Sequence, residues 1–184
     1  HSNKFVFIEK NSKIQNKSIN ADAIITKKKK FPIAILTADC VPLLIFEKRN
    51  KMIAAIHAGW RGAYKGIVQK VIKFMLNKGC KKKDMTVAIG PSISIKNYEV
   101  GKKFKDKFLK KDKKNLKFFK SIKSKIYFNL PDYTKKQVKL SQIKNIDLIN
   151  VDTFDKKNNF FSARRSLSLN HSDYGRNISI IVIN

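Results

Sequence analysis

Residues 37–62, TADCVPLLIFEKRNKMIAAIHAGWRG, decide the fold that we expect for this 184-residue chain. Two apolar runs, 41–47 and 52–58, flank the polar turn 48–51, a pattern that is typical of a β-hairpin. The same stretch holds one of the two cysteines, one of the three histidines and the only tryptophan. The hairpin therefore carries the rarest side chains of a chain that otherwise consists largely of lysine and aliphatic residues.

The register of this hairpin decides whether Cys40 and His57 can act together. If Glu47 pairs with Met52, His57 lies opposite Pro42, and Cys40 lies two residues before Pro42 on the same face. Diagonal neighbours of this kind lie about 7–8 Å apart at Cα, and a metal ion can bridge that gap. A slip of one residue would place the two side chains on opposite faces. The pair could equally be a Cys–His nucleophile pair, or a buried thiol near a structural histidine.

Outside the hairpin, short strands and amphipathic helices mix without a regular βαβ alternation. Strands are predicted at 3–9, 21–26, 84–89, 145–153 and 177–183, and a buried strand at 31–37. Helices are predicted at 61–77, at 98–110 and from 131 to about 143, and residues 112–125 form either a charged connection or a continued helix. This mixture indicates an α+β fold with mixed sheets, in a single domain that spans residues 1–184.

The net charge of +28 allows two interpretations. Clustered cations could bind nucleic acid, which makes a basic nucleic-acid-binding module the rival class of function. However, 36 of the 41 basic residues are lysine and form runs without interleaved aromatic residues, which favours a solvated surface and no specific nucleic-acid partner. Because arginine is scarce, each arginine indicates either a site that needs guanidinium geometry or a buried ion pair.

Several other classes of protein are disfavoured by what the sequence lacks. Two cysteines do not make a disulfide framework, and no apolar run approaches the length of about 20 residues that a membrane span needs. There is no GxGxxG or Walker pattern, which argues against a dinucleotide or P-loop site. We expect a cytoplasmic protein without a membrane partner, as a monomer or small homo-oligomer.

Six motifs occur in order along almost the whole chain: TADCVPLL, HAGWRG, IGPSI, YEVG, FFSARR and a late GR. Together they resemble the YfiH family, earlier described as multicopper polyphenol oxidoreductases (laccases) and now mainly regarded as purine nucleoside phosphorylases. HAGWRG after ADC is the most specific of them. Family members are usually longer at the N-terminus, so we expect that this chain lacks an N-terminal segment and that His1–Ser2 matches the end of a Q-x-H-S motif.

The resemblance implies a layered α/β fold with sheets packed between helices, and a zinc site formed by His1, Cys40 and His57. Three protein ligands leave the open fourth position that is typical of catalytic zinc. Copper suits the chain less well, because three histidines cannot build a multicopper cluster. Ser92 and Asp152 also stand where many family members have cysteine, which reduces the number of soft ligands further. His171 lies in a polar loop and is interpreted as an exposed histidine.

The activity that the resemblance implies is phosphorolysis of adenosine, inosine, guanosine and methylthioadenosine to the base and pentose 1-phosphate. Adenosine deamination is implied as a side activity, and a laccase-like oxidation or an editing of peptidoglycan precursors are alternatives. The expected partners are therefore a nucleoside and phosphate.

Candidate residues for this chemistry follow from their types and positions. Asp39 is a candidate proton shuttle or a structural cap, and Arg61 a candidate phosphate cation at the start of a helix. Arg164 and Arg165 are second candidates for binding substrate anions. Aromatic residues could stack on a purine or could be core residues: Tyr98, Phe161, Trp60 and Phe160.

Overall fold

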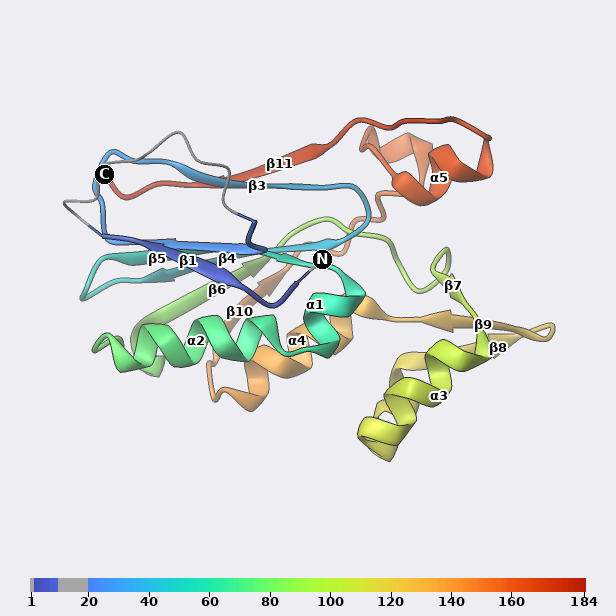
Figure 1. The fold of residues 1–184 in the computed structure, drawn as a ribbon, viewed down its shortest axis with the longest axis horizontal. Helices are drawn as coiled ribbons and strands as arrows, with labels where there is room; N and C mark the ends of the chain where they lie inside the picture. The colour runs from blue at the N-terminus through green and yellow to red at the C-terminus, as the bar shows by residue number, and fades with distance from the viewer. Residues whose placement is uncertain (1, 10–19) are drawn as a thin grey trace.

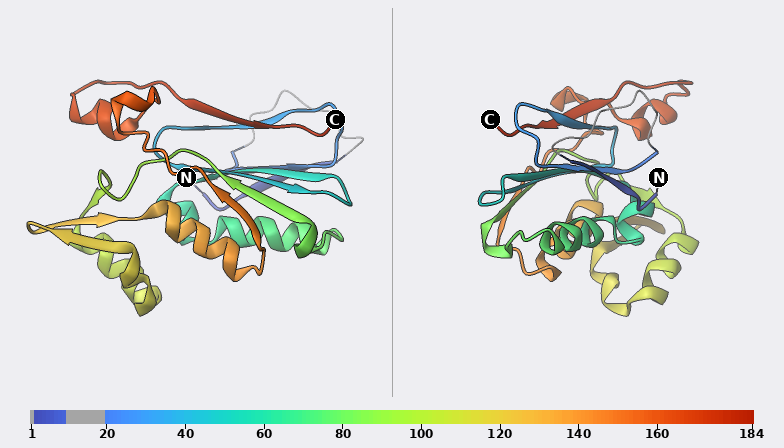
Figure 2. Two further views of the ribbon diagram at one scale, coloured as in Figure 1. Left: turned by 180° about the vertical axis from the view of Figure 1, so that it is seen from behind. Right: turned by 60° about the vertical axis from the view of Figure 1, so that its left-hand side comes forward.

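The computed structural model describes residues 2–9 and 20–184, so the predicted ligand His1 lies outside the described residues. Figure 1 shows three layers: a two-stranded sheet, a six-stranded sheet and a layer of helices. Figure 2 shows from behind and from the side that most of the helices lie on one face of the larger sheet and the two-stranded sheet lies on the other. The predicted mixture of sheets and helices is confirmed. Within the described ranges, no helix is long and apolar enough to cross a membrane.

The central layer is a mixed sheet with the strand order β1-β2-β5-β4-β6-β10. Its edge pairs β1/β2 and β6/β10 are parallel and its inner pairs are antiparallel. The predicted hairpin is β4 and β5, and its register is the expected one, since Glu47 pairs with Met52 and Pro42 with His57. The six strands are β1 (Phe5–Ile8), β2 (Ala23–Thr26), β4 (Val41–Glu47), β5 (Met52–Ala58), β6 (Met85–Ile89) and β10 (Asn145–Leu148).

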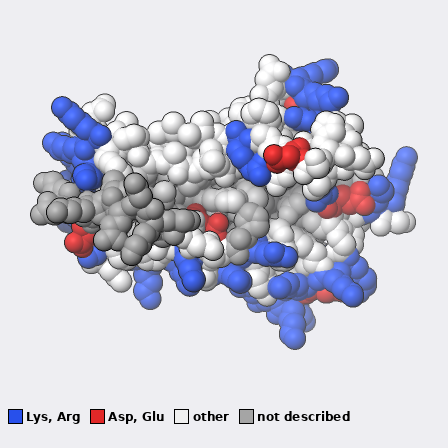
Figure 3. Space-filling model, turned by 45° about the horizontal axis from the view of Figure 1, so that its top comes forward, with Lys and Arg blue, Asp and Glu red and all other residues white. Residues whose placement is uncertain are grey.

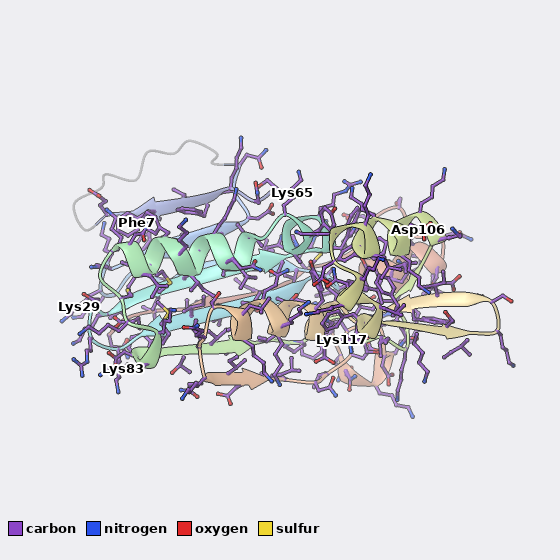
Figure 4. The ribbon with its side chains drawn as sticks, turned by 90° about the horizontal axis from the view of Figure 1, so that it is seen from below. Phe7, Lys29, Lys65, Lys83, Asp106 and Lys117 are labelled. Atoms are coloured by element: carbon purple, nitrogen blue, oxygen red, sulfur yellow. The ribbon has the colours of Figure 1, made fainter. Side chains whose placement is uncertain are left out.

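Helices α1 (Trp60–Tyr64), α2 (Ile67–Asn77) and α4 (Leu130–Leu140) cover one face of this sheet. Figure 4 shows α2 and α4 running side by side beneath it. The single helix predicted at 61–77 is wrong, because Gly66 adopts a left-handed conformation with φ of +80° and ends the first helix. Apolar spacing continues across this break, so periodicity alone could not locate it. The apolar stripe of α2 is fully or almost fully buried: Ile67, Val68, Val71, Ile72 and Met75.

The opposite face of the sheet is covered by β3 (Ile33–Thr37) and β11 (Asn177–Ile181), which pair only with each other among the described strands. The inner residues Ile33 and Ile35 pack with Ile53 in a second apolar core. The strand predicted at 31–37 is present as β3, but it is buried on one face only, because its burial alternates and Leu36 is 56% exposed on the outer face. Figure 3 shows that this outer face carries few charged side chains, whereas lysines and arginines gather toward the ends of the molecule.

A third sheet projects from the main layers, with the order β7-β9-β8, and packs beside helix α3 (Lys102–Lys111). The helix predicted at 98–110 begins later than expected, because Glu99 and Val100 form β7 by pairing with β9. Residues 112–125 are neither a simple connection nor a continued helix. They contain the 3₁₀ helix Lys113–Phe118, the strand β8 (Phe119–Ile122) and a turn that leads into β9 (Lys125–Phe128).

The remaining described elements complete the chain. Two short 3₁₀ helices span Lys82–Asp84 and Lys156–Asn158, and helix α5 spans Ala163–Ser168. The strand predicted at 145–153 is shorter than expected, because β10 ends at Leu148 and the chain then turns toward the 3₁₀ helix at 156. Helix α5 lies close to the end of β11 that is nearest to the third sheet (Figure 1).

Candidate active site

A cavity of about 270 Å³ lies where the open end of the β4–β5 hairpin meets helix α5. Two larger hollows lie along α4, but about half of their lining residues are lysine and none is histidine or cysteine. The smaller cavity is therefore the better candidate for chemistry. The residues that line it are Leu36, Thr37, Ala38, Asp39, Cys40, His57, Ile93, Tyr98, Ala163, Arg164, Leu167, Tyr174 and Arg176.

Cys40 and His57 share one wall of this cavity. Cys40 is the residue immediately before β4, and His57 is the penultimate residue of β5. Because Pro42 pairs with His57, the two side chains come to the same end of the hairpin, as the expected register requires. The hairpin thus fixes the relative position of two good metal donors.

The environment of His57 favours a neutral imidazole with a defined tautomer. Its Nδ1 lies 3.5 Å from Oδ1 of Asp22, and its backbone N–H donates to the Asp22 carbonyl over 2.8 Å. Burial lowers the pKa of His57 below its ordinary value, although the Asp22 carboxylate opposes this shift. A neutral histidine that offers Nδ1–H to a carboxylate and keeps its lone pair on Nε2 is the usual arrangement of a metal ligand.

The environment of Cys40 disfavours a nucleophile. Burial raises the pKa of its thiol to about 12, and the negative charges of Asp39 and Asp22 add to the rise. Reactive cysteines usually have lowered pKa values, because the thiolate is the attacking species. A cation bound beside the sulfur is what would stabilise a thiolate at this position.

Asp22 is a site residue that the sequence analysis missed. Its Oδ2 also accepts a hydrogen bond from the backbone N–H of Ser2, so the start of the described chain is held at the carboxylate that contacts His57. The backbone of Ser2 also lies close to Gly62 of helix α1. A Cβ atom added to Gly62 would lie only 3.0 Å from the Ser2 carbonyl oxygen. Asp22 precedes β2, and only the pairing of β2 with β5 brings it to His57.

Asp39 ties three segments together. Its Oδ1 accepts a hydrogen bond from the Thr153 hydroxyl over 2.8 Å, and its Oδ2 accepts one from the backbone N–H of Arg164 over 2.6 Å. Its backbone carbonyl accepts from the N–H of Ile93 over 3.1 Å. Asp39 also has a φ of +81°, a conformation that few residues other than glycine adopt. These contacts favour the structural alternative for Asp39 over the proton shuttle.

The predicted arginines separate into three environments. Arg164 lines the cavity. Arg165 instead donates to the carbonyl oxygens of Thr153, Phe154 and Phe160, at 2.8, 2.8 and 2.5 Å. Arg61 is exposed and does not line the cavity. Its guanidinium carbon lies 5.2 Å from the centre of the Trp60 ring.

The predicted aromatic residues separate in the same way. Tyr98 lines the cavity, and burial, followed by the charge of Cys40, raises the pKa of its hydroxyl, so it stays protonated at neutral pH. Phe161 is 54% exposed and lines a different hollow, which also contains His171. Trp60 packs against Phe104. Of the predicted residues, the cavity therefore brings together Asp39, Cys40, His57, Tyr98 and Arg164.

Asp152 supports the loop that carries Tyr98. Its carboxylate accepts hydrogen bonds from the Ser94 backbone and hydroxyl at 3.1 and 2.5 Å, and from the Asn97 side chain at 2.7 Å. Burial acts to raise the pKa of Asp152, but the bonds from Ser94, Asn97 and Phe154 outweigh burial and hold it below its ordinary value. Asp152 is thus a structural carboxylate of this loop.

The comparison with known families agrees with this site. A family model described as "Multi-copper polyphenol oxidoreductase laccase" matches residues 1–184. The chain belongs to this family. The YfiH resemblance of the motifs is thereby confirmed, and curated relatives carry an enzyme name.

Curated relatives of this YfiH-family chain are named purine nucleoside phosphorylase. That of Rickettsia prowazekii (RP494) is 36% identical over 165 residues, which cover 89% of this chain and 68% of the relative. That of Bacteroides thetaiotaomicron is 35% identical over 149 residues, which cover 78% of this chain and 55% of the relative.

Solved structures confirm the fold of this YfiH-family chain. The YfiH protein of Bacillus licheniformis superposes with a TM-score of 0.81 at 25% identity, over 89% of this chain and 62% of that one. Protein NMB0706 of Neisseria meningitidis gives a TM-score of 0.76 at 28% identity, over 89% of this chain and 65% of that one. The chain thus spans just under two thirds of the length of these solved proteins.

Proposed function

We propose that this protein is a zinc-dependent purine nucleoside phosphorylase whose reaction takes place in the cavity between the β4–β5 hairpin and helix α5. The observation that carries the proposal is the placement of Cys40 and His57 on one cavity wall, with Asp22 beside His57. The names of the relatives support the reaction class. The substrates proposed are inosine, adenosine, guanosine and methylthioadenosine, together with inorganic phosphate.

The donor set suits zinc if one further ligand joins it. A thiolate and a neutral imidazole are typical zinc ligands. No group of three His, Cys, Asp or Glu residues within 2–9 and 20–184 could hold a metal on its own, so the proposed site needs a donor from elsewhere. His1 is the proposed third ligand, and the anchoring of its neighbour Ser2 at Asp22 supports this choice. When bound, zinc would supply a positive charge for an oxygen atom of a substrate or of water.

The residues that line the cavity include candidates for binding both substrates. In phosphorolysis the C1′–N9 bond of the nucleoside breaks, and its electron pair leaves with the purine. A phosphate oxygen forms the new bond to C1′, and the proton lost from hydrogenphosphate balances the proton that the purine gains. Tyr98 lines the cavity and keeps its hydroxyl proton, and we assign it as a hydrogen-bond donor to the nucleoside. Arg164 provides a cation for phosphate.

Adenosine deamination is proposed as a side activity that uses the same zinc. The laccase-like alternative gains no support from the donors, because the three histidines are too few for a multicopper cluster and His171 lines a separate hollow.

The test is release of hypoxanthine from inosine by the purified, zinc-loaded protein, with and without inorganic phosphate. We expect release only with phosphate, and its loss in Cys40→Ala. Cys80→Ala is the matched control, because Cys80 is the other cysteine, lies 3.7 Å from the Met52 sulfur and does not line the cavity. Full activity of Cys40→Ala, or release that does not depend on phosphate, would refute the proposal.

A further inference from the structure

Two of the five arginines of the chain, Arg164 and Arg176, line the cavity that holds Cys40 and His57. The only acidic residue among the described residues that line this cavity is Asp39. Both carboxylate oxygens of Asp39 already accept hydrogen bonds, one from Thr153 and one from the backbone of Arg164. The cavity therefore has a net positive charge from its arginines, although the lysines that give the chain its charge lie elsewhere.

The guanidinium of Arg164 is oriented but only partly used. Its Nη1 donates to the Glu99 carbonyl over 2.9 Å, and its central carbon lies 5.3 Å from the centre of the Tyr98 ring. A guanidinium carries five N–H donors, so one carbonyl engages a small part of its capacity. Arg165, the next residue, instead donates hydrogen bonds to three backbone carbonyls and so has a structural role.

Arg176 also lines this cavity. Its guanidinium carbon lies 3.9 Å from the centre of the Tyr174 ring, and its Nη1 donates to the carbonyls of Tyr174 and Gly175. Its ion-pair partner Asp173 is 3.9 Å away and 89% exposed, so solvent weakens this pair strongly. The side chain of Arg176 is 41% exposed, which leaves it accessible to an anion that enters from solvent.

We propose that Arg164 and Arg176 form the phosphate subsite of the cavity that Cys40 and His57 also line. This inference rests on the proposed phosphorylase function and adds to it the residues that bind the second substrate. Arginine suits this task because its planar guanidinium donates two parallel hydrogen bonds to phosphate oxygens, which a lysine cannot do. Arg164 and Arg176 take the place of two arginines that the sequence suggested for anion binding. Arg61 packs on Trp60 outside the cavity, and Arg165 donates to backbone carbonyls.

The test compares Arg176→Gln with Lys139→Gln, a control on α4 that removes the same charge away from the cavity. Loss of a charged hydrogen-bond donor typically weakens binding about tenfold to a hundredfold. We expect Arg176→Gln to raise the KM for phosphate by at least about tenfold and to leave the KM for inosine within about twofold. Lys139→Gln should leave both values unchanged. Calorimetric titration of inorganic phosphate into each protein, without nucleoside, should show the same loss of affinity.

The two readouts separate this inference from the proposed function. If the unmodified protein binds phosphate but releases no hypoxanthine, the phosphorylase proposal fails, and weaker binding in Arg176→Gln still supports the anion subsite. If the unmodified protein is active and Arg176→Gln keeps its KM for phosphate, the subsite is wrong. Absence of phosphate binding by the unmodified protein, or an equal loss in Lys139→Gln, would also overturn it.

Discussion

The two walls of the cavity are built in different ways. Cys40 and His57 come from a buried hairpin whose register fixes both positions. Arg164 comes from the short helix α5, which has no buried residue, and Arg176 comes from an exposed loop. A metal site requires donors placed within tenths of an ångström, whereas an anion site tolerates longer and more variable contacts. The wall that carries Cys40 and His57, here called the metal wall, thus suits the proposed zinc. The wall that carries Arg164 and Arg176, here called the exposed wall, suits the proposed phosphate.

Asp39 connects the two walls through its hydrogen bonds, so its replacement should disturb both walls and have the largest effect on the protein. Asp39→Ala would leave the Thr153 hydroxyl and the Arg164 N–H without their acceptor, and alanine tolerates a positive φ poorly. Each buried donor left unsatisfied costs about 1–3 kcal/mol, so we expect a loss of about 2–4 kcal/mol in the free energy of unfolding. Urea unfolding measures this. Asp39→Asn keeps one acceptor oxygen, so its loss in the free energy of unfolding should be about half as large. Equal losses in the two variants would argue against this role of the Asp39 hydrogen bonds.

Asp22 belongs to the metal wall alone, so its replacement should weaken zinc and spare the exposed wall. Asp22→Asn removes the carboxylate beside Nδ1 of His57, and the loss of such a partner typically costs about 10–100-fold in metal affinity. Competition with a chromophoric chelator measures the zinc affinity. Phosphate binding in the same variant should stay within about twofold if the two walls act separately, so a parallel loss of both affinities would contradict that separation.

Asp152 supports the exposed wall through the loop 94–98. Replacing it should cause the smallest loss of stability, and that loss should depend on pH. Its pKa is lowered in the folded protein, so its contribution to stability is present above the ordinary carboxylate pKa of about 3.9. This contribution is lost as the pH falls through the lowered pKa, because protonation removes the acceptors of Ser94 and Asn97.

Thermal unfolding of Asp152→Asn and the unmodified protein checks this sign. The difference in Tm between them should be clear near pH 6 and should shrink toward pH 2–3. A difference that grows on acidification would show that the carboxylate is not stabilised by these bonds.

The same contrast explains which parts of the molecule could be predicted from the sequence. The hairpin register was predictable because two apolar runs and a short turn allow one pairing that buries both strands. The placement of Arg176 was not, because it depends on the path of loop 170–176 and on contacts such as Asp39 with the Arg164 backbone, 125 residues apart. Asp22 was missed for a similar reason, since it reaches His57 only through the pairing of β2 with β5.

The central claim, a zinc ion held by Cys40 and His57 on the metal wall, is tested most directly by metal analysis of the purified protein. Inductively coupled plasma mass spectrometry of the unmodified protein, Cys40→Ala and Cys80→Ala would give the zinc content per chain. We predict about one zinc per chain in the unmodified protein and in Cys80→Ala, and close to none in Cys40→Ala. Full zinc occupancy in Cys40→Ala, or no zinc in the unmodified protein, would contradict the account.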